Sequence, residues 1–350
     1  MILDAIVAVF AAAVATFAMF PARRLTGVAR AGDRTLSIVI PARNEERNVG
    51  ELIDSINTTL DIVCDVIVVD DGSVDATGDV ARQHGATVVR IDDLPAGWSG
   101  KAHACWRGAE AARGDVLLFV DADVRFESHA SMFVSAALGL IETEPDRLIS
   151  AQPWHTPKSF GERLSLTFNV VSVMASRCRG LWHSRRPLVF GPFVMCDAQV
   201  YRSLGGHGHE SVRSSVVEDI ALGRLFRKVD VTTAPADALT FRMYLSGARG
   251  VIAGFTKNLG SAAGTSSPLA VVAVVSWFVF LCSPLTVSPI MYPVCVAHVA
   301  VMAHSVGRFR LIDAVLYPIH LVVFVMVLVR SAWRRWFVGS VAWSGRRIEI

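Results

Sequence analysis

The chain has 350 residues, of which 52% are hydrophobic and only 19% charged, and its net charge is +3. This composition favours a membrane-attached protein over a freely soluble one, and the small net charge gives no reason to expect nucleic acid as a partner. The six cysteines form no CxxC pair, which argues against a zinc knuckle or a dithiol redox site.

The first predicted element is an apolar helix. Residues 2–20 are nearly all apolar, and the run is about as long as the ~20 residues that cross a bilayer. Positive charges follow it at Arg23, Arg24 and Arg30, which by the positive-inside rule places the next part of the chain in the cytoplasm. We therefore predict an uncleaved transmembrane anchor over residues 1–22 rather than a cleaved signal peptide.

Short apolar runs then alternate with helical stretches over residues 36–262. The pattern predicts strands at 36–42, 65–71, 86–91 and 115–123, with helices at 48–56, 75–85 and 99–112. Such alternation is typical of an α/β domain in which helices cover both faces of a mostly parallel sheet.

Apolar character returns after Pro268. Residues 268–331 contain three candidate membrane segments, at 269–282, 286–305 and 312–330, followed by a basic tail over 332–350. Three full crossings would place Arg334 and Arg335 outside the cell, against the positive-inside rule. We therefore expect two or three membrane segments, with one of them not crossing.

Two acids follow the most apolar of the predicted strands, in LLFVDADV. Alternation along a strand would place Asp121 and Asp123 on one face, roughly 6.6 Å apart. Two carboxylates at this spacing can meet one divalent cation, with substrate phosphates and water as further ligands. The alternative is a pair of solvated acids in a turn.

The two preceding strands also end in polar residues. The first runs into PARNEE, where Asn44 and Glu45 are expected to open a helix, and the second runs into DDGS at Asp70 and Asp71. Ligands of open parallel sheets bind beyond the carboxyl ends of the strands, so the three ends predict one site. A nucleoside fits it, because a carboxylate can accept hydrogen bonds from a base N–H and from ribose hydroxyls. The alternative for DDGS is a turn with a helix cap.

The blocks SIVIPARNEE, VIVVDDGSVDAT, GWSGKAHAC and LLFVDADV together resemble the family 2 glycosyltransferases, which have the GT-A fold. The resemblance covers roughly residues 36–260 and implies transfer of a sugar from a UDP- or GDP-sugar. Within that family, the RMY…GF.KN stretch and the W-S-G-R tail look like those of the carotenoid-acid and hopanoid-associated glycosyltransferases. The chain has neither a GxGxxG motif nor a P-loop.

The resemblance also implies roles for single residues. Asp123, together with Asp121, would hold Mg²⁺ or Mn²⁺ on the sugar-nucleotide diphosphate. The nucleotide-sugar would be bound by Pro41, Ala42, Glu45, Asp71, Lys101 and Asp121.

Sugar transfer with inversion needs a base on the acceptor hydroxyl. The family has a Glu-Asp pair at the place of Glu218 and Asp219, and its Asp is the usual base, which makes Asp219 the candidate here. The alternative is a helix start, since Ser215 and Glu218 have the spacing of a capping box.

The resemblance also implies a loop on the acceptor side of the site, near residues 205 and 206. Gly205 and Gly206 would let the backbone approach a ligand closely. Arg242 is a candidate for binding phosphate or the acceptor. Arg242, Arg249 and Lys257 could each contact either a phosphate or lipid headgroups, and the sequence leaves both alternatives open. The neighbouring His207 and His209 lack a third metal ligand nearby and are interpreted as polar loop residues.

Taken together, the sequence predicts a metal-dependent, inverting glycosyltransferase in the cell membrane, multi-pass, with a cytoplasmic catalytic domain. Its acceptor would be a hydroxyl or carboxyl of a lipid that reaches the site from the bilayer. One alternative is a polyprenyl-phosphate sugar transferase, whose acceptor is already an anion and needs no base. Another is a non-catalytic membrane scaffold that only binds nucleotide-sugar, although a scaffold would not need acids at 71, 121, 123 and 219.

Overall fold

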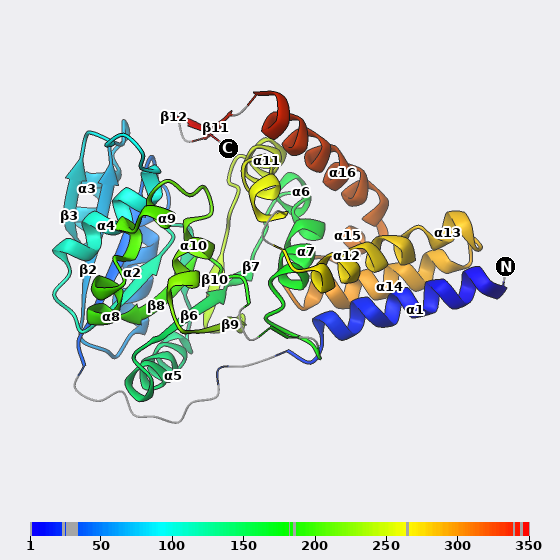
Figure 1. The fold of residues 1–350 in the computed structure, drawn as a ribbon, viewed down its shortest axis with the longest axis horizontal. Coiled ribbons are helices and arrows are strands. Elements are labelled where there is room, and N and C mark those ends of the chain that lie inside the picture. Colours follow the sequence, from blue (N-terminus) through cyan, green and yellow to red (C-terminus); the bar gives the residue numbers. More distant parts are fainter. Residues whose placement is uncertain are drawn as a thin grey trace.

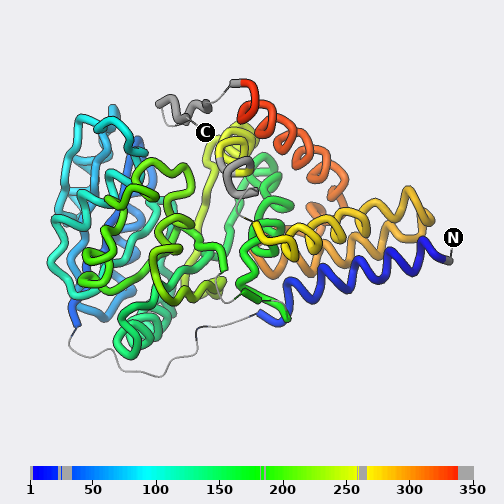
Figure 2. Tube along the Cα trace, viewed as in Figure 1, coloured from blue at the N-terminus to red at the C-terminus, as the bar shows by residue number. Residues whose placement is uncertain are grey.

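A computed structural model describes residues 2–22, 25, 34–181, 183–184, 187–263, 266–338, 340–343 and 346–349. Arg23, Arg24 and Arg30, and Ser344 and Gly345 of the tail, lie outside this part. The α/β domain and a layer of long helices lie side by side (Figure 1). The N-terminal helix runs along helices from the last third of the chain (Figure 2), so the two ends of the sequence build one layer.

The α/β domain is built on a mixed, seven-stranded sheet of order β3-β2-β1-β4-β8-β6-β9. All neighbouring pairs are parallel except those of β8, which runs antiparallel to β4 and β6. The mostly parallel sheet is confirmed. The strands are β1 (Leu36–Ala42), β2 (Cys64–Asp71), β3 (Thr87–Ile91), β4 (Val116–Val120), β6 (Arg147–Gln152), β8 (Phe193–Asp197) and β9 (Lys228–Thr233).

Helices cover both faces of this sheet. Alternate residues of β1 face opposite apolar clusters, with Val39 in one and Ile38 in the other, and both are fully buried. The helix α4 packs into the first cluster through Cys105, and α2 packs into the second through Leu52. The helices of this domain are α2 (Val49–Thr59), α3 (Thr77–Gln83), α4 (Gly100–Ala111), α5 (Ala130–Thr143), α8 (Ala198–Ser203), η1 (Gly206–Gly208), α9 (Glu210–Arg213) and α10 (Glu218–Leu225).

A small sheet of β5 (Val124–Phe126), β10 (Leu239–Phe241) and β7 (Trp154–His155) connects the α/β domain to the helical layer. A hairpin of β11 (Ser340–Trp343) and β12 (Arg346–Glu349) follows the last helix.

The helical layer packs α1 against α12 and α16 against α11. A buried ion pair joins two of its short helices, because Arg163 Nε donates to Asp313 Oδ1 at 2.9 Å and the Asp313 side chain is fully buried. The layer consists of α1 (Ile2–Met19), α6 (Phe160–Arg163), α7 (Leu166–Ser176), α11 (Ala248–Ala263), α12 (Pro268–Leu281), α13 (Ser283–Thr286), α14 (Met291–His304), α15 (Leu311–Val315), α16 (Tyr317–Trp333) and η2 (Arg334–Val338).

The helical layer contains less spanning length than the sequence predicts. Within the described ranges, the one helix long and apolar enough to cross a bilayer is the continuous stretch Tyr317–Phe337. The apolar helices Leu3–Met19, Pro268–Leu281 and Met291–His304 are shorter. Transmembrane helices at both ends of the chain are therefore not confirmed.

Candidate active site

The carboxyl ends of β2, β1 and β4 lie next to one another in the sheet. Ala42 pairs with Asp70 at the end of β1 and β2, and β4 lies on the other side of β1. Parallel strands place their carboxyl ends at one edge, which is where the three acidic segments of the sequence meet.

The Asp-Ala-Asp segment forms a turn and not the end of a strand. The strand β4 ends at Val120, and the Val124 N–H donates to the carbonyl of Asp121 at 3.1 Å. The prediction of a strand through residue 123 is therefore wrong, and strand alternation does not set the separation of the two acids. Arg125 stabilises the turn by donating to the carbonyls of Ala122 and Val124 at 3.1 and 2.8 Å.

Lys101 joins the acid at the end of β4 to the start of α10. Its Nζ lies 2.6 Å from Asp121 Oδ1 and 3.4 Å from Glu218 Oε1. Burial by itself would lower the pKa of Lys101, but Asp121 and Glu218 outweigh it and hold that pKa well above its ordinary value. The lysine therefore stays charged among the acids.

The pair Glu218 and Asp219 occupies the first turn of α10, without the predicted capping box. The helix begins at Glu218 with Val217 as N-cap and no side-chain cap, and the Ser215 hydroxyl accepts from the Val217 N–H instead. Glu218 is buried against Lys101, which leaves the half-buried Asp219 as the more open carboxylate of the two.

Asp219 lies against the backbone of Gly191. Its Oδ1 accepts from the Ile220 N–H at 2.8 Å. A Cβ added at Gly191 would lie 3.0 Å from both Asp219 Oδ2 and Lys101 Nζ, so a glycine keeps room beside both groups. Sequence reasoning missed Gly191, because no local pattern shows which side chains approach it. Burial and the adjacent Glu218 raise the pKa of Asp219 to about 7.

The acids at the strand ends suit a divalent cation. Burial, Asp121 and Glu45 raise the pKa of Asp123 to about 7, because three carboxyl groups crowd one region. No group of three or more His, Cys, Asp or Glu side chains converges on one metal position within the part of the chain that the structure describes. A metal site at Asp121 and Asp123 therefore stays a prediction, and a cation there would need phosphate and water as further ligands, as Mg²⁺ commonly does.

An open cleft of about 750 Å³ begins at Asp123. Its volume is within the usual range for small-molecule sites. The cleft is lined by Asn44, Glu45, Glu46, Arg47, Asn48, Asp75, Asp123, Met243, Tyr244, Leu245, Ser246, Arg249, Gly250 and Ala253. One wall thus comes from the loop after β1 and the other from the start of α11.

Hydrogen bonds fix the wall of the cleft that the loop after β1 forms. The Asn44 N–H donates to Ser73 Oγ at 3.0 Å, and the Glu45 N–H donates to Thr77 Oγ1 at 2.8 Å, so the loops after β1 and β2 support each other. The Asn48 amide donates to the Glu45 carboxylate at 2.8 Å. The helix α2 begins at Val49, so the expectation that Asn44 and Glu45 open it is wrong.

Asp70 and Asp71 have different surroundings. Asp70 caps the turn by accepting from the Ser73 N–H at 2.9 Å, and it also pairs with Arg90 at 3.1 Å. The buried Asp71 lies 4.0 Å from Arg43. Of the predicted donor residues, Pro41 and Ala42 are the last two of β1, next to this turn. The interpretation of DDGS as a structural turn is confirmed, and nucleoside binding by Asp71 stays a prediction.

The glycines predicted for the acceptor side serve packing. A Cβ at Gly206 would lie 2.2 Å from the Tyr201 ring, and both Gly205 and Gly206 have positive φ. His207 Nδ1 lies 2.9 Å from the Tyr201 hydroxyl, and His209 Nδ1 lies 2.8 Å from Ser211 Oγ, which agrees with polar loop roles. An acceptor role for either glycine stays a prediction.

Arg242 is engaged with an acid outside the cleft lining. Its guanidinium donates to both oxygens of Glu162, at 2.9 and 2.8 Å. Burial raises the pKa of Glu162, but the bonds from Arg242 and from the Lys158 backbone outweigh it and lower that pKa to about 2. The predicted phosphate role of Arg242 is untested by this arrangement.

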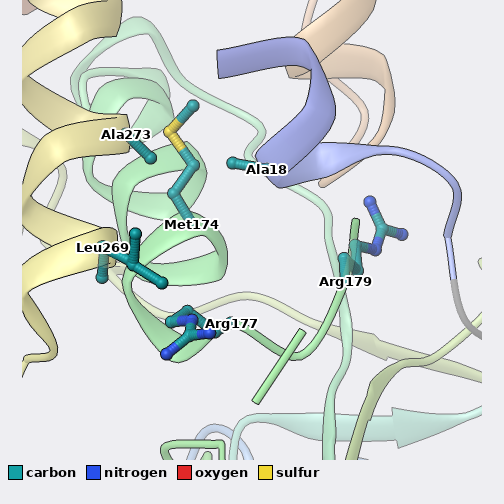
Figure 3. Close-up of a pocket in the computed structure, with 7 residues that line it drawn as sticks. Ala18, Met174, Arg177, Arg179, Leu269 and Ala273 are labelled. Atoms are coloured by element: carbon teal, nitrogen blue, oxygen red, sulfur yellow. The ribbon is translucent and has the colours of Figure 1, made fainter. Parts of the chain in front are cut away.

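A second, smaller pocket lies between α1, α7 and α12 (Figure 3). Its lining contains no acid, and the side chains of Arg177 and Arg179 point to different sides. This pocket therefore has no part in the acidic site.

Comparison with known proteins decides the family. The profile of Glycosyl transferase family 2 matches residues 37–199. The chain is 31% identical over 338 residues to a 4,4'-diaponeurosporenoate glycosyltransferase of Staphylococcus aureus strain MRSA252, covering 91% of this chain and 89% of the relative. The enzyme of the same name from strain USA300 matches with the same figures. The chain belongs to glycosyltransferase family 2.

The fold of this family 2 glycosyltransferase is also found among solved structures. A mannosyltransferase from Pyrobaculum calidifontis, in complex with GDP-Man and Mn²⁺, aligns over 96% of both chains with a TM-score of 0.56 and 16% identity. The similarity at this identity concerns the fold alone, and it supports the GT-A architecture described above.

Proposed function

We propose that this protein is an inverting, metal-dependent glycosyltransferase that moves a sugar from a nucleoside diphosphate to a hydroxyl or carboxyl group of a lipid. The observation that carries the proposal is the meeting of Lys101 with Asp121 and Glu218 at the sheet edge, next to Asp219. These residues come from three separate segments, and a structural role alone does not require four charged groups, one buried and three half-buried, in one place.

The donor would occupy the cleft that begins at Asp123. Glu45 lines this cleft and Asp71 ends the neighbouring strand β2, and both carboxylates would accept from ribose hydroxyls and a base N–H. Asp121 and Asp123 would hold Mg²⁺ or Mn²⁺, which when bound neutralises charge on the diphosphate. One similarity points the same way, because the mannosyltransferase is named as a complex with GDP-Man and Mn²⁺.

The transfer step needs a proton acceptor and a stabilised leaving group. Asp219 would take the proton of the acceptor group as its oxygen attacks the sugar carbon on the face opposite the diphosphate, which inverts that carbon. Lys101, which lies beside Asp121, would stabilise the diphosphate as its negative charge increases. Glu218 would hold Lys101 in position rather than react.

The acceptor is proposed to be a lipid because of the surface beside the site. Large apolar side chains are exposed on α1, α12 and α16, among them Phe10 at 68%, Val272 at 52% and Val322 at 68%. A bilayer in contact with these helices would cover this surface and supply an apolar acceptor without a passage through water. The curated relatives are named for a diaponeurosporenoate, and they are similar over most of the chain.

The test uses membranes that contain the full chain, incubated with a panel of labelled UDP- and GDP-sugars and then extracted with organic solvent. We expect label in the organic phase with Mn²⁺ and its loss with EDTA or with the variant Asp123→Asn. The control Asp79→Asn changes an acid whose side chain is 76% exposed on α3 and should keep full activity. No labelled lipid with any donor would overturn the proposal, and label that persists under EDTA would overturn its metal.

A further inference from the structure

One face of α11 lines part of the cleft. Arg249, Gly250 and Ala253 of this helix line the cleft that begins at Asp123. Lys257 follows Ala253 by four residues and Gly250 by seven, which is the spacing of one helical face. It therefore continues the cleft-lining face about 6 Å further along the axis, at ~1.5 Å per residue.

Lys257 lies where that face meets the acids. The charged groups that act on its ammonium are Glu218, Lys101, Asp121 and Asp219, all members of the proposed catalytic cluster. Burial lowers the pKa of Lys257, and Glu218 opposes that effect. The face thus carries Arg249 in the cleft and Lys257 within electrostatic reach of the acids.

The helix holds Lys257 next to the apolar layer. The Ser331 hydroxyl of α16 donates to the carbonyl of Thr256 at 2.8 Å, so the neighbouring residue of α11 is fixed against the long apolar helix. The rings of Phe255 and Phe168 stack with centroids 4.1 Å apart, which fixes the same turn against α7. A molecule arriving from the side of α16 would therefore approach the turn of α11 that carries Lys257.

We propose that Lys257 binds the carboxylate of a carboxylic-acid acceptor and so selects acids over alcohols. The proposal rests on the proposed function and names its acceptor class. The acids at 121, 123, 218 and 219 repel an anionic acceptor, and Lys101 already interacts with two of them. A second cation at the acceptor end offsets this repulsion, whereas a neutral alcohol gains little from it.

The chemistry balances without a further reagent. One oxygen of the carboxylate forms a bond to the anomeric carbon, and the bond from that carbon to the diphosphate oxygen breaks with its electron pair on the diphosphate. The product is a glycosyl ester. An ionised acid brings no proton, so Asp219 is needed as base only for a protonated acid or an alcohol.

The test compares two probes of equal chain length, hexadecanoic acid and hexadecan-1-ol, on the full-length protein with saturating donor and Mn²⁺. We expect Lys257→Met to raise KM and the dissociation constant for the acid at least about tenfold, the usual value of a charge-assisted bond, and to change those for the alcohol little. Lys257→Arg should keep most of the preference for the acid. The control Lys158→Met alters an exposed lysine and should behave as the wild type.

Each other outcome overturns the inference. An unchanged ratio of acid to alcohol in Lys257→Met, or no preference for the acid in the wild type, rules out carboxylate selection. A rise in donor KM with an unchanged acid constant would assign Lys257 to the diphosphate. Release of nucleoside diphosphate is measured in parallel, because a wild type that cleaves no donor with either acceptor refutes the proposed function instead. Thermal melts exclude misfolded variants, and Lys257→Arg tests the charge if Lys257→Met does not fold.

Discussion

The exchange Asp219→Asn tests the proposed base most directly. Asparagine keeps the size of the side chain and an oxygen that can accept from the Ile220 N–H, now 2.8 Å from Oδ1, but it cannot take a proton. General-base catalysis contributes ~10²–10⁴ in rate, or roughly 3–5 kcal/mol of the activation barrier. We expect kcat with an alcohol acceptor to fall by that factor, while the donor KM stays nearly constant because the donor cleft is lined by other residues.

The pH profile gives this prediction a second readout. Asp219 acts as base only when ionised, and burial with the adjacent Glu218 raises its pKa to about 7. The wild-type rate should therefore rise about tenfold per pH unit in acid and level off near pH 7. A bound divalent cation favours the ionised carboxylates, so with saturating Mn²⁺ the bend should lie below that pH.

Rates over pH 5 to 9 with labelled donor and an alcohol acceptor provide the assay. Asp219→Asn should lose the bend that belongs to the base, and Asp79→Asn should retain it. An Asp219→Asn variant with full activity and an unchanged profile would refute Asp219 as the base.

Three further predictions concern the same structure. Asp123→Asn should raise the melting temperature at pH 8 in EDTA. The pKa of Asp123 in the folded protein, about 7, is above its ordinary value, so the wild type loses stability from this group as pH rises through 7, whereas below about pH 4 the group costs nothing. Melts that show no gain in the variant would contradict the burial of this carboxyl. Gly191→Ala should lower kcat about tenfold with little loss of stability, because its Cβ would lie 3.0 Å from Asp219 Oδ2 and Lys101 Nζ; unchanged kinetics would mean that neither group needs that space. Asp313→Ala should lower the free energy of unfolding by roughly 3–5 kcal/mol in denaturant, because it leaves Arg163 buried without its ion-pair partner. The double variant Arg163→Met with Asp313→Leu should restore part of this loss. An Asp313→Ala variant as stable as the wild type would contradict the prediction.

The local sequence determined most elements of the α/β domain. The predicted strand at 36–42 agrees with β1 at both ends, and the helix at 99–112 agrees with α4 to within one residue at each end. These segments carry their own signals, a continuous apolar run in one case and a helical period after Ser99 in the other. The acidic ends of the first strands could also be placed at one edge, because parallel strands leave no other arrangement.

Tertiary contacts decided the rest. The predicted strand over 115–123 stops at Val120 because Arg125 and the Val124 N–H close a turn around the two acids, and a period of two cannot reveal such a turn. The spacing of Ser215 and Glu218 suggests a cap, yet Glu218 turns to Lys101, more than a hundred residues earlier in the chain.

The sequence by itself therefore determined the family, the parallel half of the sheet and which acids stand at strand ends, since each depends on neighbours in the chain. Only the tertiary structure decided which groups touch: Lys101 with Asp121 and Glu218, Gly191 beside Asp219, and Arg242 with Glu162 instead of the cleft. The physical reason is that charges and close contacts act over a few ångströms in space, whatever the separation of the residues along the chain.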